Sequence, residues 1–109
     1  MRVRLPSELI VDWDTFHSVS KETFGFPDFY GRNMNAWIDC LTYIREGDGM
    51  SNVVLDPHEM LEIEVPHTKA FNARLPDVFS ALVECSAFVN SNNEDPVISL
   101  VFTEDLPKY

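Results

Sequence analysis

Hydrophobic residues recur along the middle of the chain at the spacing of an α-helix. When residues 34–46 are wound at roughly 100° per residue, apolar side chains gather on one side and polar ones on the other. The apolar side holds Met34, Trp37, Cys40, Leu41 and Ile44, and the polar side holds Asn35, Asp39, Thr42 and Glu46. This pattern predicts an amphipathic helix, in which we expect Trp37, Leu41 and Ile44 to be buried and Asp39 and Thr42 to be exposed.

The residues that precede this helix are those of a turn. Pro27 fixes its own φ, and Gly31 can supply a positive φ that other residues adopt only at a cost. Asn33 or Asn35 can then cap the first turn of the helix with its side-chain oxygen. We therefore expect a tight connection that leads directly into the helix.

The polar side of this helix is a candidate binding surface. Phe29 and Tyr30 stand near its N-terminal end, Ile38 and Tyr43 lie at its margins, and Asp39 is at its centre. A carboxylate opposite the core side can present its charge to a partner without being neutralised by its own protein. On spacing alone, however, a solvated helix face remains the more common explanation of such a pattern.

Two further helices are predicted. Asp12 is a suitable N-cap for a helix that ends at Gly25. Another helix begins near Asn72, has Pro76 in its first turn and is broken within residues 91–95. Its apolar stripe comprises Val78, Phe79, Leu82, Cys85 and Val89.

Three segments have the pattern of strands. Residues 2–5 alternate basic and apolar side chains. Residues 61–65 alternate apolar residues with Glu62 and Glu64, which indicates either a strand with one buried face or an edge strand protected by charge. Residues 97–102 are almost continuously apolar, which favours a buried strand.

The segment between the central helix and residue 61 is harder to interpret. The sequence SNVVL, residues 51–55, is also strand-like, and a plausible turn at residues 56–59 separates it from residues 60–65. We expect residues 47–59 to form a surface excursion, with a strand that pairs with residues 61–65 as one possibility.

Strands separated by helices imply parallel pairing through right-handed crossovers. The predicted fold class is therefore α/β, with a small three-stranded parallel sheet flanked by helices. With 109 residues, of which 45% are hydrophobic, the chain is long enough for one domain with a real core, and we expect a single domain over residues 1–109.

Charge restricts the classes of partner. Eighteen acidic residues against eight basic ones give a formal net charge of −10. Such a balance repels phosphate backbones and anionic lipids, so we expect no direct binding of nucleic acid or membranes, and it attracts basic partners. Solubility alone would also explain an acidic chain.

The sequence favours a reduced, cytoplasmic protein. Its two cysteines do not make a disulfide-rich scaffold, and no CxxC spacing indicates zinc. The N-terminal residues lack the apolar run and cleavage site of a signal peptide, and no segment has the length of a membrane span.

No motif supports catalysis or a cofactor. Glu62 and Glu64 are a common kind of pair in an acidic chain, and His58 and His67 lack a compact metal-ligand spacing such as HExxH. Cys40 belongs to the core side of its helix, so we interpret it as a small buried hydrophobe. We expect neither enzymatic activity nor a bound metal.

The central stretch carries a family resemblance. PDFYGRNMNAWIDCLT, residues 27–42, resembles the signature of the barstar family, the intracellular inhibitors of secreted guanyl-specific ribonucleases. The residues that fit are Pro27, Tyr30, Gly31, Asn33, Ala36, Asp39, Cys40, Leu41 and Thr42. The resemblance implies a barstar-like α/β fold with the same three-stranded parallel sheet. It also implies that Asp39 enters the active site of a nuclease, where it pairs with arginines and a catalytic histidine.

Several positions depart from the family pattern. Where the family has tyrosine, aspartate, tryptophan, glycine and tryptophan, this chain has Phe29, Asn35, Ile38, Tyr43 and Ile44. The second acidic contact of the family aligns with Ala81, although Glu84 follows one turn later. The acidic hydrogen-bonding set is thus smaller, which favours a cognate nuclease with a different surface.

The sequence therefore predicts an inhibitor, or immunity protein, that binds and blocks the active site of a basic ribonuclease or related toxin. The expected partner-binding residues are Phe29, Tyr30, Gly31, Asn33, Asn35, Ile38, Asp39, Thr42, Tyr43 and Glu46. We expect no cofactor, and a monomer when the protein is free. The alternative is a protein-interaction module that has this fold without nuclease inhibition.

Overall fold

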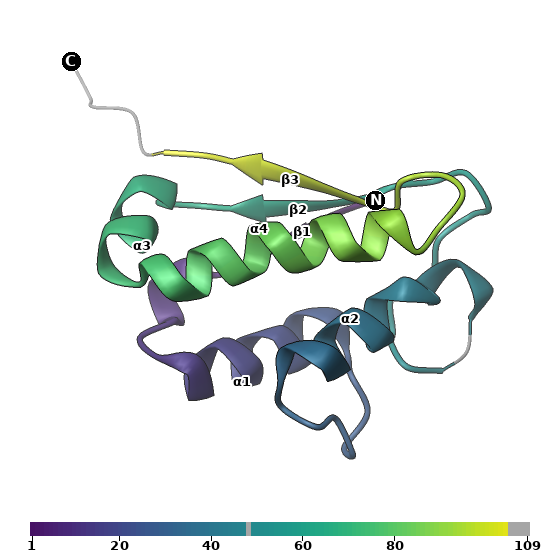
Figure 1. Cartoon of the computed structure of the whole chain (residues 1–109), viewed down its shortest axis with the longest axis horizontal. Coiled ribbons are helices and arrows are strands. Elements are labelled where there is room, and N and C mark those ends of the chain that lie inside the picture. The colour runs from purple at the N-terminus through teal and green to yellow at the C-terminus, as the bar shows by residue number, and fades with distance from the viewer. Residues whose placement is uncertain (48, 105–109) are drawn as a thin grey trace.

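The sheet has three parallel strands, as the sequence predicts. The computed structural model of the chain describes residues 1–47 and 49–104. In it, β1 (Arg2–Arg4), β2 (Leu61–Val65) and β3 (Ile98–Phe102) lie in the order β1-β2-β3 (Figure 1). Val3 is opposite Ile63, and Ile63 is opposite Leu100. The predicted fold class is confirmed.

The central strand has one face in the core and the other toward solvent. Leu61, Ile63 and Val65 are fully buried, whereas Glu62 is exposed. Because β2 has a neighbour on each side, the edge position considered for it is wrong. On the outer face, Glu64 Oε1 accepts a hydrogen bond from Arg2 Nη2 at 3.2 Å.

The apolar strand β3 is an edge strand, which differs from the buried position predicted for it. Within β3 only Ile98 is buried, and Phe102 is 49% exposed. Its continuous apolar run reflects contact with α4 on one side, where the rings of Phe79 and Phe102 lie 5.5 Å apart. The apolar run therefore predicted a strand correctly, but it did not predict that this strand lies at the edge of the sheet.

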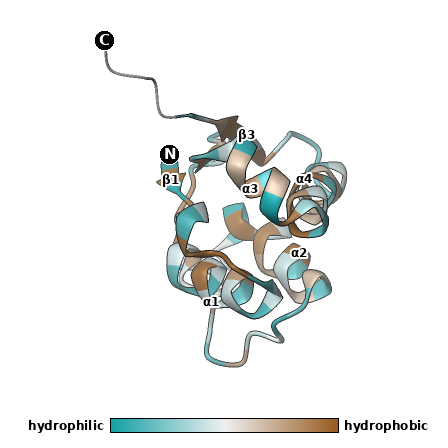
Figure 2. Cartoon of the chain, turned by 90° about the vertical axis from the view of Figure 1, so that its left-hand side faces the viewer, coloured by the Kyte–Doolittle hydropathy of each residue, from teal (hydrophilic) through white to brown (hydrophobic). Residues whose placement is uncertain are grey.

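The helices lie on one side of this sheet (Figure 2). They are α1 (Trp13–Phe24), α2 (Met34–Thr42), α3 (Thr68–Arg74) and α4 (Pro76–Ser91), with 3₁₀ turns η1 (Ser7–Leu9) and η2 (Ile44–Glu46). Among the helices of the described chain, none is both long and apolar enough to cross a membrane.

The predicted caps of α1 are confirmed. The carboxylate of Asp12 accepts the backbone N–H of Thr15 at 2.8 Å, in a reciprocal capping box. At the other end, Gly25 adopts φ 64°, the left-handed conformation that closes many helices.

The helix expected to begin near Asn72 is in fact two helices. Leu75, which separates α3 from α4, has φ −136° and ψ 65°. Proline disfavours the α-conformation in the residue before it, so Pro76 ends α3 at Arg74 and starts α4 itself.

The segment after η2 contributes to the core without forming a strand. Leu55 is 5% exposed and belongs to the same apolar cluster as Trp37. The described residues 49–60 contain no strand, and the pairing considered for residues 51–55 could not form because both edges of β2 are occupied. The backbone N–H of Asn52 instead donates to Phe24 O at 3.0 Å, at the end of α1.

Candidate partner-binding surface

The exposed face of α2 is a narrow ridge. Asn35, Asp39 and Tyr43 follow one another at intervals of about one turn, and all three are exposed. We call these three residues the α2 ridge. Opposite them, Trp37, Leu41 and Ile44 are at most 3% exposed, so the predicted phase of the helix is confirmed.

Asp39 occupies the middle of the ridge. Within residues 1–47 and 49–104 its carboxylate takes part in no hydrogen bond and no ion pair. The nearby acidic residue Asp28, by contrast, lies 3.4 Å from Lys21 Nζ. The ridge thus presents an uncompensated negative charge to solvent.

The loop before α2 presents one aromatic ring and buries the other. Phe29 is 75% exposed, whereas Tyr30 is only 6% exposed. The Tyr30 hydroxyl lies 2.7 Å from His17 Nδ1, and its ring lies 4.7 Å from that of Phe26. The side chain of Tyr30 is therefore largely buried, and it anchors the loop to α1.

Burial changes the protonation of this anchor. It raises the pKa of the Tyr30 hydroxyl. It also lowers the pKa of His17, and the Arg32 guanidinium lowers it further, while Asp14 acts in the opposite direction. The anchor is therefore built from a neutral imidazole and a neutral phenol.

The turn into α2 uses a different residue from the one predicted. Arg32, and not Gly31, has the positive φ, at 53°. An ion pair compensates for this uncommon conformation, since Arg32 Nη2 lies 2.6 Å from Asp14 Oδ1. Gly31 is exposed, with room that is limited by Ala36 and Asn33. Asn33 is the N-cap, and its Oδ1 accepts the Ala36 N–H at 2.8 Å.

Thr42 is buried, which corrects the prediction that it is exposed. It is 4% exposed, and its hydroxyl donates to Ile38 O at 2.7 Å. Asn92 Nδ2 donates to Thr42 Oγ1 at 3.4 Å, and Asn93 Nδ2 donates to Thr42 O at 3.0 Å. The C-terminal end of α4 therefore covers Thr42.

Two structural elements lie beside the α2 ridge. The loop before α2 lies along one side and α4 along the other (Figure 1). Ile38 is half-buried. Glu46 is exposed on η2, beyond the C-terminal end of α2. Of the predicted residues, seven are exposed and Ile38 is half-buried; the exposed ones are Phe29, Gly31, Asn33, Asn35, Asp39, Tyr43 and Glu46. The side chains of Tyr30 and Thr42 are buried, and Asn33 also caps α2.

The family described as barstar (barnase inhibitor) matches residues 1–103, which is nearly the whole chain. The chain belongs to the barstar family. No curated protein sequence matches it. Members of the barstar family are inhibitors that bind ribonucleases as protein partners, and they are not enzymes.

Few of the expected partner-binding residues are charged. Asn35 carries an uncharged amide, and Ala81 is a half-buried residue on α4. The two cationic side chains nearest in sequence are already engaged, Arg32 with Asp14 and Arg45 with backbone carbonyls. Among the expected partner-binding residues, Asp39 and Glu46 carry the only carboxylates.

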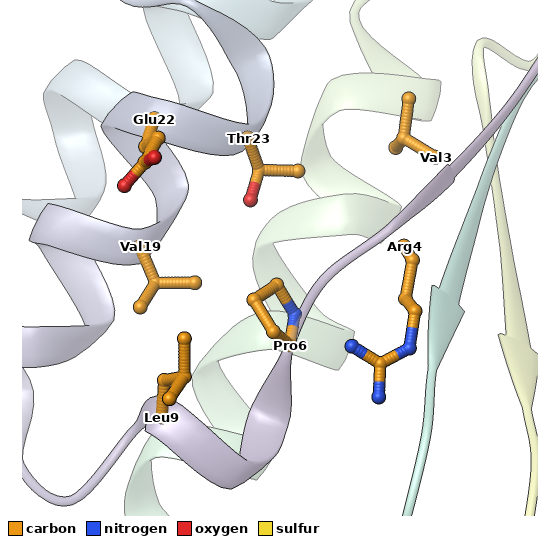
Figure 3. A pocket seen from close by; sticks show the side chains of 7 residues that line it. All are labelled: Val3, Arg4, Pro6, Leu9, Val19, Glu22 and Thr23. Carbon is orange, nitrogen blue, oxygen red and sulfur yellow. The ribbon is translucent and has the colours of Figure 1, made fainter.

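A separate hollow lies on another face of the molecule. It has a volume of about 410 Å³ and lies between β1, η1 and α1 (Figure 3). Pro6, Leu9 and Val19 provide apolar walls, and Glu22 and Arg4 stand at its rim. None of the residues of the α2 ridge lines it, so its side chains provide controls for the ridge.

Sequence reasoning missed the residues that fix the C-terminal end of α2. Arg45 donates from Nη2 to Glu59 O at 2.9 Å and to Pro96 O at 2.6 Å, and from Nη1 to Asp95 O at 2.9 Å. Asn92 and Asn93 act from α4. The sequence contains only an indirect sign of these contacts. Arg45 directly follows the apolar stripe of α2, and the two asparagines lie at the end of a helix, where such side chains often form hydrogen bonds to the backbone.

Proposed function

We propose that the chain is an intracellular inhibitor of a basic ribonuclease or related toxin, in the manner of an immunity protein. In this proposal the α2 ridge enters the active site of the nuclease and blocks access to RNA. Membership of the barstar family supports the general class of partner.

One observation carries the proposal: Asp39 is exposed on a rigid helix and has no partner in the described chain. An active site that binds RNA phosphates is rich in cationic side chains. A preorganised carboxylate can occupy the place of a phosphate there and form charge-assisted hydrogen bonds with those cations. The side chain needs no release from an internal ion pair before it binds.

The neighbouring residues have supporting roles. Phe29 and Tyr43 are 75% and 49% exposed, and each can cover apolar surface around the charged centre. Tyr43 also offers a hydroxyl, which Phe29 does not. Asn35 and Glu46 can form hydrogen bonds with the partner on the same exposed surface. The overall charge of −10 would speed encounter with a basic protein.

The first test is capture followed by an activity assay. The immobilised wild-type chain and an Asp39→Ala variant are exposed to lysate and to secreted protein of the source cells, and bound proteins are identified by mass spectrometry. We expect the wild type to retain a basic nuclease that the variant loses, and the purified wild-type chain to inhibit RNA hydrolysis by that nuclease. If the wild-type chain retained only proteins that lack nuclease activity, the result would favour the alternative of an interaction module without nuclease inhibition.

A further inference from the structure

The free edge of β3 lacks the charged side chains that the other edge of the sheet has. At that other edge β1 carries Arg2 and Arg4, and charged residues are a common means of preventing unwanted pairing at an edge strand. The residues of β3, by contrast, include no charged side chain. An uncharged, mostly apolar edge of this kind can accept a further strand.

Every second residue of β3 uses its backbone groups to pair with β2. Thr103 N–H, directly after β3, donates to Val65 O at 3.2 Å. Because successive residues of a strand point their backbone groups to opposite sides, residues 99, 101 and 103 face β2. The residues whose backbone groups face the free edge are Ile98, Leu100 and Phe102.

A side chain already takes the place of a strand at one end of this edge. Asn90 Oδ1 accepts the Ile98 N–H at 2.8 Å, and Asn90 Nδ2 donates to Ile98 O at 3.0 Å. The amide of Asn90 thus forms the pair of hydrogen bonds that a neighbouring strand would form. Within residues 1–47 and 49–104, no group does the same for Leu100 or Phe102. The edge is therefore open over the C-terminal half of β3.

Helix α4 adds an apolar surface next to this edge, since it lies against the sheet beside β3 (Figure 1). Phe79 and Asn90 both contact β3 from α4, Phe79 through its ring, which lies 5.5 Å from that of Phe102. Val83 lies between them on the same face of the helix and is 39% exposed, and Phe102 is 49% exposed. Apolar side chains on one face of an added strand would therefore pack against Val83 and Phe102.

The charge of this region determines which kind of strand fits. Residues 75–104, which include α4 and β3, contain five acidic residues and no lysine, arginine or histidine. A second copy of the chain, paired antiparallel to β3 about a two-fold axis, would bring Glu104 of each copy toward residues 94–95 of the other, and like charges would meet. A strand with basic residues at its ends would instead place opposite charges there.

We propose that the free edge of β3 binds an extended segment of a partner protein, in which alternating apolar residues are flanked by lysine or arginine. The segment would form a fourth strand through hydrogen bonds with Leu100 and Phe102. Its apolar face would pack on Val83 and Phe102, and its basic ends would lie near residues 94–95 and Glu104. None of these residues belongs to the α2 ridge, so the site is separate from the proposed contact with a nuclease.

The test uses a synthetic peptide and the full-length protein. The peptide acetyl-KKVTVTVKK-amide is titrated into ¹⁵N-labelled protein, and amide chemical shifts and hydrogen exchange are followed by NMR. At about ten times the measured Kd, exchange of the Leu100 and Phe102 amides should slow about tenfold, because only the free protein exchanges. The Ser99 and Val101 amides already face β2, so their exchange should change much less and serves as an internal control.

Two further peptides separate the contributions of backbone and charge. The peptide acetyl-KKVTPTVKK-amide keeps the basic ends, but its central proline removes a backbone donor and interrupts the ladder. The peptide acetyl-EEVTVTVEE-amide keeps the strand pattern and reverses the charges. Neither should produce saturable shift changes at residues 98–102.

Matched variants make the assignment specific. Val83→Lys replaces an apolar contact by a cation and should weaken binding of the basic peptide by at least about threefold. Val54→Lys makes the same change at an exposed valine in the loop before β2 and should bind the peptide like wild type. Asp39→Ala should also bind it like wild type, because the α2 ridge takes no part. Unchanged thermal transitions would verify that the variants are folded.

Three results would overturn the proposal. The first is exchange that slows no more at Leu100 and Phe102 than at Ser99 and Val101. The second is equal binding of the proline peptide, or shifts that spread without saturation over acidic residues of all faces. The third is protection of the Leu100 and Phe102 amides that rises with protein concentration in the absence of peptide, since a second copy would then occupy the edge.

Discussion

Asp39 and Thr42 stand three residues apart on α2 and have different environments. Both belong to the polar side of a helical projection, yet Asp39 is exposed and Thr42 is 4% exposed. The difference arises because α2 has two neighbours: its apolar side faces the core, and Thr42 faces the end of α4. A projection of one helix cannot show the second neighbour, since the asparagines that cover Thr42 lie about fifty residues later.

The first prediction concerns Thr42. Thr42→Val keeps the shape of the side chain but removes the hydroxyl that donates to Ile38 O and accepts from Asn92. We expect a loss of about 1 kcal/mol in the free energy of unfolding, measured by urea denaturation, because a buried hydrogen-bonding group loses its partner. Binding should change little. If the variant kept its stability but bound the nuclease clearly more weakly, Thr42 would instead be a residue that contacts the nuclease.

The second prediction concerns the His17–Tyr30 anchor. Because the folded-state pKa of His17 is lowered, the unfolded state binds a proton more readily, and stability rises with pH in this range. The contribution of neutral His17 is complete above the unfolded pKa of about 6.5 and is lost as pH falls below it. We expect the free energy of unfolding to decrease from pH 7.5 to pH 5.

His17→Phe is the matched variant for this pH dependence. It keeps an aromatic ring beside Trp13 and Phe16 but cannot be protonated. Its overall stability should be lower, since the Tyr30 hydroxyl loses its partner, whereas its decrease between pH 7.5 and pH 5 should be clearly smaller. An equal slope in both proteins would show that other groups cause the pH dependence.

At the scale of elements, local signals predicted helix ends well. Asn33 caps α2 and Asp12 caps α1, as their types and positions indicated, and Gly25 ends α1. The alternation of residues 61–65 likewise identified β2 and its buried face. These features depend on neighbours in the sequence, and the chemistry of a cap or of a pleat is local.

Elements whose position depends on distant contacts were less predictable. The short helix α3 has only seven residues and lacks the length that makes a periodic pattern visible. The positive φ of Arg32 is maintained by Asp14, eighteen residues earlier. The buried position of Tyr30 likewise requires His17 from α1. In each case the deciding partner lies on another element.

The third prediction tests how the C-terminal end of α2 is fixed. The Arg45 guanidinium bonds to carbonyls in the two loops that lead into β2 and β3. Arg45→Met keeps an apolar stem but leaves three carbonyls without this donor, so we expect a loss of about 1–3 kcal/mol in thermal or urea unfolding. Methionine cannot replace the planar fork of donors.

Arg2→Met is the control for this variant. Arg2 is an exposed arginine on β1 whose main contact is an ion pair with Glu64. Exposed ion pairs contribute little, so the loss should be at most about 1 kcal/mol. If the two variants were equally stable, the carbonyl contacts of Arg45 would be unimportant for the fold.

At the scale of the whole molecule, the family match and the parallel sheet agree with the fold predicted from the alternation of strands and helices. The formal net charge of the chain is −10, and it includes the Asp39 carboxylate, which has no ion-pair partner within the described residues. This charge would therefore attract a basic partner before the two proteins touch. Ions in solution limit the range of the attraction because they screen the electric field.

The fourth prediction follows from that field. The association rate with the captured nuclease, measured by stopped-flow fluorescence, should fall steeply as salt rises, because the Debye length shortens to about 8 Å at physiological ionic strength. The dissociation rate should change much less. An association rate that is independent of salt would contradict electrostatic steering.

The most direct test of the central claim is calorimetry on Asp39. Wild type, Asp39→Ala and the control Glu22→Gln are titrated against the captured nuclease at one salt concentration. We expect Asp39→Ala to lose about 2–5 kcal/mol of binding free energy, a general range for buried charge pairs that is already known from ribonuclease–inhibitor complexes of this family. Glu22→Gln should bind like wild type, and both variants should keep the thermal transition of the wild type. Equal affinities of wild type and Asp39→Ala would contradict the claim that the α2 ridge blocks the active site of a nuclease.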